Sequence, residues 1–242
     1  MSPAEHEIMR EAEEQHWWYA VLHQLVLAEM RTRVKPGAAV LDAGCGTGGM
    51  MARMAGWDAK GVDISPAAVW HCQERGLHEV TQASVCELPF PDASFDLVLS
   101  LDVLYHQQVD DISALKEMAR VLRPGGILIL NLPAMECLRG AHDAAVCGSR
   151  RYTVCHMRNL FRAHRLTVKM IHYWNAWLFL PLLAWRWWSR HAPKGRSDLR
   201  RLPTWVNRTL MMAGHLDARL CRYVRPPFGS SVFAVVHRSE TV

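Results

Sequence analysis

The chain has 242 residues, of which 50% are hydrophobic and 21% charged, a composition typical of a folded domain with a full core. The acidic N-terminus lacks the basic and apolar regions of a secretory signal, and the seven cysteines show no CxxC spacing, which argues against a disulfide framework or a zinc site. We therefore expect a cytoplasmic protein with no bound metal.

Charge divides the chain into an acidic and a basic part. Residues 1–149 carry 11 Lys and Arg against 20 Asp and Glu, whereas residues 150–242 carry 17 against 3. Most of the basic residues are Arg, which favours contact with phosphates, carboxylates or anionic surfaces. An equally weighted alternative is that the two parts neutralise each other within one fold.

Apolar residues recur at helical spacing through residues 4–34, which predicts one or two helices that end at Pro36 and Gly37. Strands are then expected at residues 38–41, 60–64, 80–83, 95–100, 127–132, 166–173 and 231–237, and helices at 50–54, 66–76, 112–122 and 157–164. Alternating strands and helices form βαβ units. The sequence thus predicts an α/β, Rossmann-like, doubly wound and mostly parallel seven-stranded sheet.

Two additions to this sheet are expected. Residues 1–35 are predicted to form an N-terminal helical cap, and residues 36–242 the domain proper. Between the last two strands, residues 174–229 form an Arg/Trp-rich insertion that is predicted to be helical. We expect one domain overall.

The most informative stretch is residues 40–49, Val-Leu-Asp-Ala-Gly-Cys-Gly-Thr-Gly-Gly. Glycines let backbone N–H groups approach a ligand, and Asp42 in front of them can accept a hydrogen bond from an amine. The same acid would repel a pyrophosphate, which argues against a dinucleotide, and no Gly-Lys-Ser/Thr sequence indicates a nucleoside triphosphate site. Asp63, which ends the second strand, can hold two ribose hydroxyls. An amino acid joined to a nucleoside fits both acids.

With these motifs the chain resembles the class I S-adenosylmethionine-dependent methyltransferases, in the group that includes the ubiquinone and menaquinone enzymes. Residues 40–49 and 61–65 resemble the first motif and the ribose-binding motif, and residues 88–90, 94–98, 101–106 and 120–126 resemble later ones. The resemblance implies S-adenosyl-L-methionine as cofactor. It implies these cofactor-binding residues: Asp42, Ala43, Gly44, Cys45, Gly46, Asp63, Ile64, Ser84, Val85, Leu101, Trp18 and Tyr19.

One of these positions departs from the family pattern. The third strand of the family usually supplies an Asp to the adenine amine, and the aligned residue here is Ser84. A hydroxyl accepts this hydrogen bond more weakly than a carboxylate does. Trp18 and Tyr19 belong to a helix that we expect to close over the cofactor, although an ordinary aromatic core would explain them nearly as well.

Two residues after the fourth strand are the catalytic candidates. His106 is the leading general base, because imidazole titrates near neutrality, and Tyr105 is expected to orient the substrate. Purely structural roles remain the alternatives for both. Asp102 is a further candidate base, with the capping of its loop as the favoured alternative.

Substrate residues are expected beyond the fifth strand. Arg150, Arg151 and Tyr152 are predicted to clamp a carboxylate or phosphate, with a solvated basic turn as the alternative. Asn175 belongs to a Tyr-Trp-Asn sequence that is similar to one in a bacterial subgroup of the family, and we expect it at the substrate.

Residues 174–188 are apolar apart from Asn175 and Arg186, and too short to cross a bilayer, which needs roughly 20 residues. We weigh three roles for this segment. The first is a lid over the substrate pocket; the second is peripheral contact with an anionic membrane, suggested by Trp at both ends and Arg nearby. The third is a dimer surface, and the oligomeric state stays open.

The favoured function is transfer of a methyl group to O, N or C of a small hydrophobic or anionic metabolite, such as a natural-product or lipid-linked intermediate. The second hypothesis is an RNA or protein methyltransferase that uses the Arg/Trp-rich half. Nucleic acid is the less favoured partner, because the chain lacks both an Asn/Asp-Pro-Pro-aromatic motif and a separate nucleic-acid-binding module. The third hypothesis is a binding module without catalysis.

Overall fold

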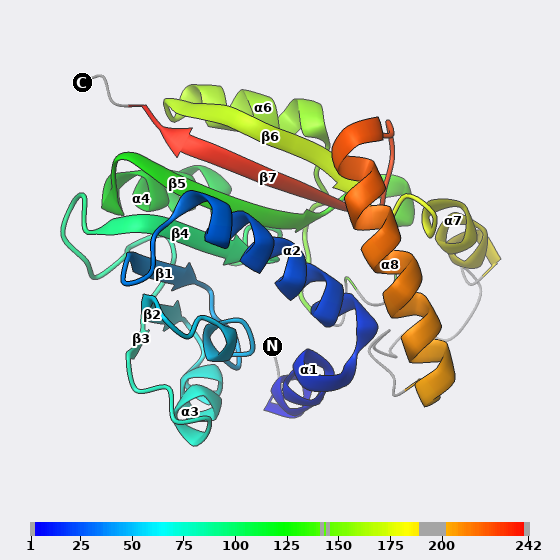
Figure 1. Cartoon of the computed structure of the whole chain (residues 1–242), viewed down its shortest axis with the longest axis horizontal. Coiled ribbons are helices and arrows are strands. Elements are labelled where there is room, and N and C mark those ends of the chain that lie inside the picture. Colours follow the sequence, from blue (N-terminus) through cyan, green and yellow to red (C-terminus); the bar gives the residue numbers. More distant parts are fainter. Residues whose placement is uncertain (1–2, 141–142, 144–145, 189–201, 240–242) are drawn as a thin grey trace.

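The computed structural model describes residues 3–140, 143, 146–188 and 202–239, which form one sheet with helices on both faces (Figure 1). The strands are β1 (Ala39–Ala43), β2 (Asp58–Asp63), β3 (Val80–Gln82), β4 (Phe95–Leu101), β5 (Leu122–Pro133), β6 (Leu166–Trp174) and β7 (Ser231–Arg238). The helices are α1 (Pro3–Gln15), α2 (Trp17–Arg33), α3 (Pro66–Glu74), α4 (Asp111–Val121), α6 (Val154–Ala163), α7 (Phe179–Trp188) and α8 (Thr204–Val224).

The sheet has seven strands in the order β3-β2-β1-β4-β5-β7-β6. The first five strands pair in parallel, and β7 runs antiparallel to both β5 and β6. This arrangement confirms the predicted doubly wound, mostly parallel sheet with a helical insertion before the last strand. In an open parallel sheet ligands bind at the carboxyl ends of the strands, where the order reverses between β1 and β4.

Two apolar clusters hold the helices to the sheet. Helices α4 and α6 pack on one face and α2 and α8 on the other. In α2 the buried residues Val21, Leu22, Val26 and Met30 follow the helical period. Helix α2 is therefore a layer of the core, whereas α1 lies beyond the end of the sheet (Figure 1).

The insertion fixes the corner between α1 and α2. Asn207 on α8 accepts a hydrogen bond from the Trp17 backbone at 2.9 Å and donates one to Gln15 O at 2.7 Å. Glu29 on α2 is fully buried and pairs with Arg222 of α8 at 2.9 Å. Since each buried polar group requires such partners, α8 determines where the N-terminal helices lie.

Two predicted elements differ in the structure. The helix expected at residues 50–54 is one 3-10 turn, Met51–Arg53, because glycine-loop residues and Gly56 leave no room for a longer amphipathic run. Trp174, expected in the insertion, is the last residue of β6 and is fully buried, with its indole N–H donated to Asn131 Oδ1 at 2.8 Å.

Candidate active site

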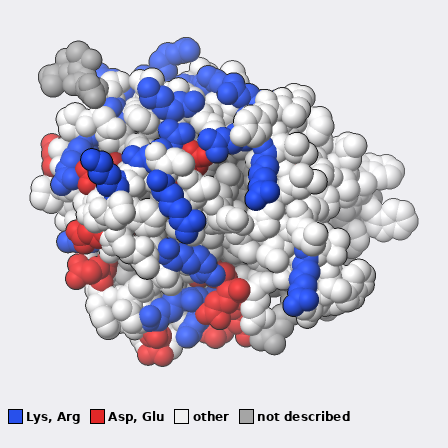
Figure 2. Space-filling view, in the orientation of Figure 1, with Lys and Arg blue, Asp and Glu red and all other residues white. Residues whose placement is uncertain are grey.

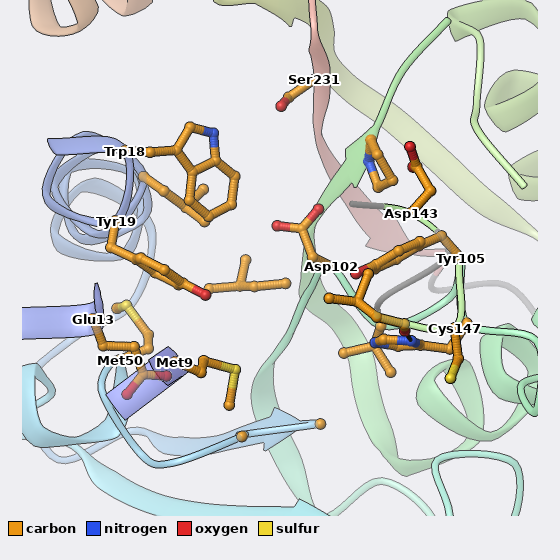
Figure 3. A pocket seen from close by; sticks show the side chains of 18 of the residues that line it. Met9, Glu13, Trp18, Tyr19, Met50, Asp102, Tyr105, Asp143, Cys147 and Ser231 are labelled. Atoms are coloured by element: carbon orange, nitrogen blue, oxygen red, sulfur yellow. Dashed lines mark hydrogen bonds between the residues drawn. The ribbon is translucent and has the colours of Figure 1, made fainter. Parts of the chain in front are cut away.

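A cavity of about 570 Å³ lies at the carboxyl ends of the strands, within the size range of small-molecule sites. Its lining comes from the glycine loop, the loops after β2, β3 and β4, the N-terminal helices and α7. Figure 3 shows Met9, Glu13, Trp18 and Tyr19 on one side, and Asp102, Tyr105, Asp143 and Cys147 on the other. The cavity is thus one space that lies between the N-terminal helices and the loops after β4 and β5.

The glycine loop needs its glycines for two separate reasons. Gly44 and Gly46 have φ of +90° and +55°, values that residues with a Cβ rarely adopt. A Cβ on Gly44 would also lie 2.3 Å from a Val103 methyl, and one on Gly46 would lie 2.8 Å from Met9 Cε. The loop is therefore packed between the β4 loop and α1, with its backbone against the cavity.

Three carboxyl groups surround this loop. Burial, together with the charges of Glu13 and Asp63, raises the pKa of Asp42 to about 8. Burial likewise raises the pKa of Glu13 to about 7, although Thr47 donates to it at 2.5 Å and Arg75 lies 3.3 Å away. A cation placed in the cavity beside Asp42 would stabilise its charged form. The site thus fits a ligand with a positively charged amine.

Asp63 and Ser84 occupy the side expected for the nucleoside. Asp63 accepts hydrogen bonds from the backbone N–H groups of Gly46 at 3.0 Å and Ser65 at 2.9 Å, so its carboxylate is fixed in direction. Ser84 Oγ accepts from Cys86 N at 3.1 Å, and one lone pair remains for a ligand donor. Ile64 is 59% exposed although it lines the cavity, which gives it an open apolar face for a base.

The N-terminal helices supply one wall of the cavity. Met9 and Glu13 come from α1, and Trp18 and Tyr19 from α2 (Figure 3). The ring of Trp18 stacks on buried Trp174 with centroids 6.0 Å apart. Burial raises the pKa of Tyr19 well above its usual value, so its hydroxyl stays protonated. The predicted residues Trp18 and Tyr19 do line the cavity.

Asp102 is held in place by a chain of hydrogen bonds. Asn131 Nδ2 donates to Asp102 Oδ2 at 2.8 Å, and Trp174 donates to the same amide. The Asp102 backbone has φ +55°, and Figure 3 shows its carboxylate aimed into the cavity. Burial raises the pKa of Asp102 to about 7 against the opposing effects of Asn131 and Arg151. Its carboxylate therefore faces the cavity and does not cap the loop.

His106 also lines the cavity, in one defined tautomer. Its Nδ1 lies 2.9 Å from Val146 O, and because a carbonyl only accepts, Nδ1 carries the proton and Nε2 has the lone pair. Burial lowers the pKa of His106, so the ring is neutral at pH 7. The ring of Tyr105 packs against this ring at a tilt of 32°, with centroids 4.3 Å apart, and also packs on Gly148.

Asn175, which the sequence predicted at the substrate, is a buried polar residue of the cavity lining. The residue is fully buried, lines the cavity, and has φ +54°. Among the described residues neither atom of its amide has a hydrogen-bond partner, which is costly for a buried group unless a ligand supplies one. Its backbone N–H is donated to Asp217 at 2.5 Å, and Ala176 N donates to the same carboxylate at 3.0 Å. The fold thus presents this amide to the cavity.

The predicted arginine clamp does not form. Tyr152 is fully buried outside the cavity, and its hydroxyl donates to Leu104 O and lies 2.9 Å from Asp111 Oδ2. Arg150 also lies outside the cavity, paired with Asp111 at 3.0 Å. Only Arg151 reaches the cavity, and it is paired with Asp143 at 2.9 Å. The two arginines are neutralised by Asp111 at the start of α4 and by Asp143, which is why they do not converge on a ligand.

Of the other predicted site residues, all but one line the cavity. Ala43 lies in the core and not in the cavity lining, because its side chain points to the α4 face of the sheet. The remaining predicted cofactor residues, the two catalytic candidates and Asn175 line the cavity: Asp42, Gly44, Cys45, Gly46, Asp63, Ile64, Ser84, Val85, Leu101, Trp18, Tyr19, Tyr105 and His106.

Several lining residues were missed from the sequence. They come from three separate parts of the chain and were not predicted as site residues: Met9 and Glu13 on α1, Met50 just after the glycine loop, and Ser231. Glu13 lies inside the helical stretch predicted for residues 4–34, and no local pattern there marks it as a site residue. Ser231 begins β7, and only the antiparallel pairing of β7 with β5 brings it to the site.

Comparisons with known proteins identify a matching family, similar sequences and similar solved structures. Residues 41–130 match a family described as a methyltransferase domain. The protein named probable tRNA methyltransferase 9B of Mus musculus is 40% identical over 104 residues, which are 42% of this chain and 23% of that protein. The 2-methyl-6-phytyl-1,4-hydroquinone methyltransferase of Synechocystis is 39% identical over 102 residues, which are 39% of this chain and 32% of that protein.

The chain therefore spans about a quarter to a third of the length of these curated relatives. Among solved structures, a chain in the complex of the Haloferax volcanii Trm112 methyltransferase activator with a methyltransferase aligns with a TM-score of 0.63 at 20% identity, over 95% of this chain and 93% of that one. At this identity the likeness shows the fold.

Proposed function

We propose that the chain is a class I S-adenosylmethionine-dependent methyltransferase and that it methylates O, N or C of a small hydrophobic or anionic metabolite. The observation that carries this proposal is the cavity at the carboxyl ends of the strands. It has the acid-lined glycine loop at one end and an apolar, aromatic wall with a few polar groups at the other. Such an enclosed space suits a small acceptor beside the cofactor.

In this proposal Asp42 and the backbone of Gly44 and Gly46 hold the amino-acid end of S-adenosylmethionine, and Asp63, Ile64 and Ser84 hold the adenosine end. The buried, raised-pKa carboxyl of Asp42 supports this assignment, because it lacks a cation that the ligand would bring. Bound S-adenosylmethionine supplies an electrophilic methyl group on a sulfonium. The protein's own part is to position the acceptor and, where needed, to take its proton.

We assign the proton acceptor to Asp102 and a positioning role to His106. A base works best when its pKa lies near the working pH, and that of Asp102 is raised to about 7 whereas that of His106 is lowered. The lone pair on His106 Nε2 can accept a hydrogen bond from the acceptor. Tyr105 packs on His106 and is proposed to orient the acceptor together with Asn175.

The test is a methyl-transfer assay with labelled S-adenosylmethionine against a panel of phenols, hydroquinones, carboxylic acids and amines. We expect label in at least one lipophilic acceptor and equal release of S-adenosylhomocysteine. A folded protein that binds S-adenosylhomocysteine but labels no member of the panel would favour the binding-module hypothesis.

A second candidate function is RNA methylation, favoured by the similarity to a protein named as a tRNA methyltransferase and by the basic half of the chain. Phosphate contacts make RNA binding strongly dependent on salt. Filter binding of bulk tRNA at low and high salt tests this. Tight, salt-sensitive binding together with label in RNA would replace the small-molecule proposal.

A further inference from the structure

Helix α7 is an apolar helix that buries none of its residues. Its sequence is Phe-Leu-Pro-Leu-Leu-Ala-Trp-Arg-Trp-Trp. Leu180, Trp187 and Trp188 are 66%, 69% and 80% exposed. A helix of this composition ordinarily buries its apolar face, and an exposed patch of this kind marks an interaction site.

Helix α8 adds a second exposed apolar stripe from the same insertion. It buries Gly214, Ala218 and Cys221 on one side. On the other side, at spacings of three, four or seven residues, it exposes a row of large apolar side chains, all more than half exposed: Trp205, Met212, Leu216, Leu220 and Tyr223. Figure 1 shows α7 and α8 at the same end of the sheet, and the rings of Phe179 and Phe228 pack together there at 5.0 Å.

The charge of this region favours an anionic partner. Arg208 and Arg219 are exposed on α8 and flank its apolar stripe by helical spacing. Between residues 174 and 229 the sequence has nine Arg but two acids, Asp198 and Asp217. Asp217 is buried, with its carboxylate occupied by backbone N–H groups. Figure 2 shows largely uncharged surface over α7 and α8, with isolated basic side chains along α8.

We propose that the outer surface of α7 and α8 docks on an anionic phospholipid bilayer. Tryptophan and arginine on an apolar helix are typical of an element that lies in the headgroup region. In the described part of the chain no helix has the length and apolarity to span a membrane, so the contact is a surface one. A protein partner would need complementary acids, and among the described residues of α7 and α8 the one acid, Asp217, is buried and so is not offered by a second copy.

The same helix joins this surface to the cavity. Leu182 and Trp185 of α7, and Leu178 just before it, line the cavity, and Trp185 is also 60% exposed, so it stands at the mouth. Docking would place that mouth against the bilayer, and a lipophilic acceptor could enter without crossing water. The docking goes beyond the proposed methyl transfer and does not depend on it.

Flotation of the full chain with lipid vesicles, without cofactor or acceptor, tests the docking. The probes are vesicles of phosphatidylcholine alone and of phosphatidylcholine with about one quarter phosphatidylglycerol. We expect binding to the anionic vesicles that weakens at high salt. Trp187→Ala with Trp188→Ala should weaken it about tenfold. The double variant Arg208→Gln with Arg219→Gln should weaken binding to the anionic vesicles by about fivefold for each arginine removed.

Trp70→Ala is the matched control, because Trp70 is 53% exposed on α3, away from this surface, and it should bind vesicles as the parent chain does. Light scattering of the lipid-free protein measures its oligomeric state and so tests the alternative that the surface binds a second copy of this chain. A folded parent chain that does not float, or floats equally well in all variants, would overturn the docking. A dimer that dissociates in the tryptophan variant without vesicle binding would assign the surface to a second copy.

Discussion

At the residue scale, Asp42 couples stability to cofactor binding. Its carboxyl has a pKa raised to about 8 in the folded protein, against about 3.9 in an unfolded chain. The folded state therefore holds the proton more tightly, and stability is lost as pH rises from about 4 to about 8. Asp42→Asn should raise the unfolding free energy of the ligand-free protein at pH 8 by about 2–4 kcal/mol.

The same substitution should weaken S-adenosylhomocysteine binding at least about a hundredfold, because a cationic amine loses its carboxylate. In the parent chain affinity should rise between pH 6 and pH 8, as Asp42 loses its proton. Thermal melts and calorimetric titration at several pH values measure both effects. A variant that is less stable and binds normally would show that Asp42 is structural.

Asp102 should determine the pH dependence of turnover. With a pKa near 7, the rate should rise with pH up to about 7 and then level off, because the base must be deprotonated. Asp102→Asn should lower kcat about a hundredfold or more and remove this rise, with little change in cofactor affinity. His106→Gln should raise KM more than it lowers kcat. If His106→Gln abolishes the pH-dependent limb and Asp102→Asn preserves it, the two roles must be exchanged.

At the scale of elements, α8 controls the wall formed by α1 and α2. Asn207→Ala removes both hydrogen bonds to the corner at Gln15 and Trp17 and should cost about 1–3 kcal/mol. Hydrogen exchange in α1 should speed up and S-adenosylhomocysteine should dissociate faster. Thr209→Ala is the control, because its hydroxyl bonds only to Trp205 O within the helix. Equal rates of hydrogen exchange in α1 of both variants would show that α8 does not control the closure of the site.

Many of the helices, strands and cofactor-end residues could be predicted from the sequence. The run from Val40 to Gly49 combines an apolar strand, an acid and several glycines. This local pattern alone indicates the cofactor end of the site. Ser65 and Pro66 likewise begin α3 as their residue types predict. The residues at the acceptor end were harder to predict from the sequence. Arg150 and Tyr152, for example, are partnered by Asp111, which only the tertiary fold brings near. Asn175 and Asp102 depend on long-range contacts in the same way.

At the scale of the whole molecule, the cavity joins elements from both ends of the chain: α1 and α2, the β1, β2 and β4 loops, and α7. A ligand that touches them all should stabilise the entire fold. Saturation at about one hundred times the Kd should raise the unfolding free energy by about 2.7 kcal/mol. A melt in which S-adenosylhomocysteine shifts only part of the transition would show that the N-terminal helices do not close on it.

The most direct test of the account is calorimetric titration of the parent chain with S-adenosylhomocysteine, beside Asp42→Asn and the control Asp58→Asn. Asp58 lies exposed at the opposite end of β2 from Asp63. We predict one site per chain in the parent and the control, and at least about a hundredfold weaker binding in Asp42→Asn. Folded parent protein without measurable binding, or equal affinity in all three proteins, would contradict it.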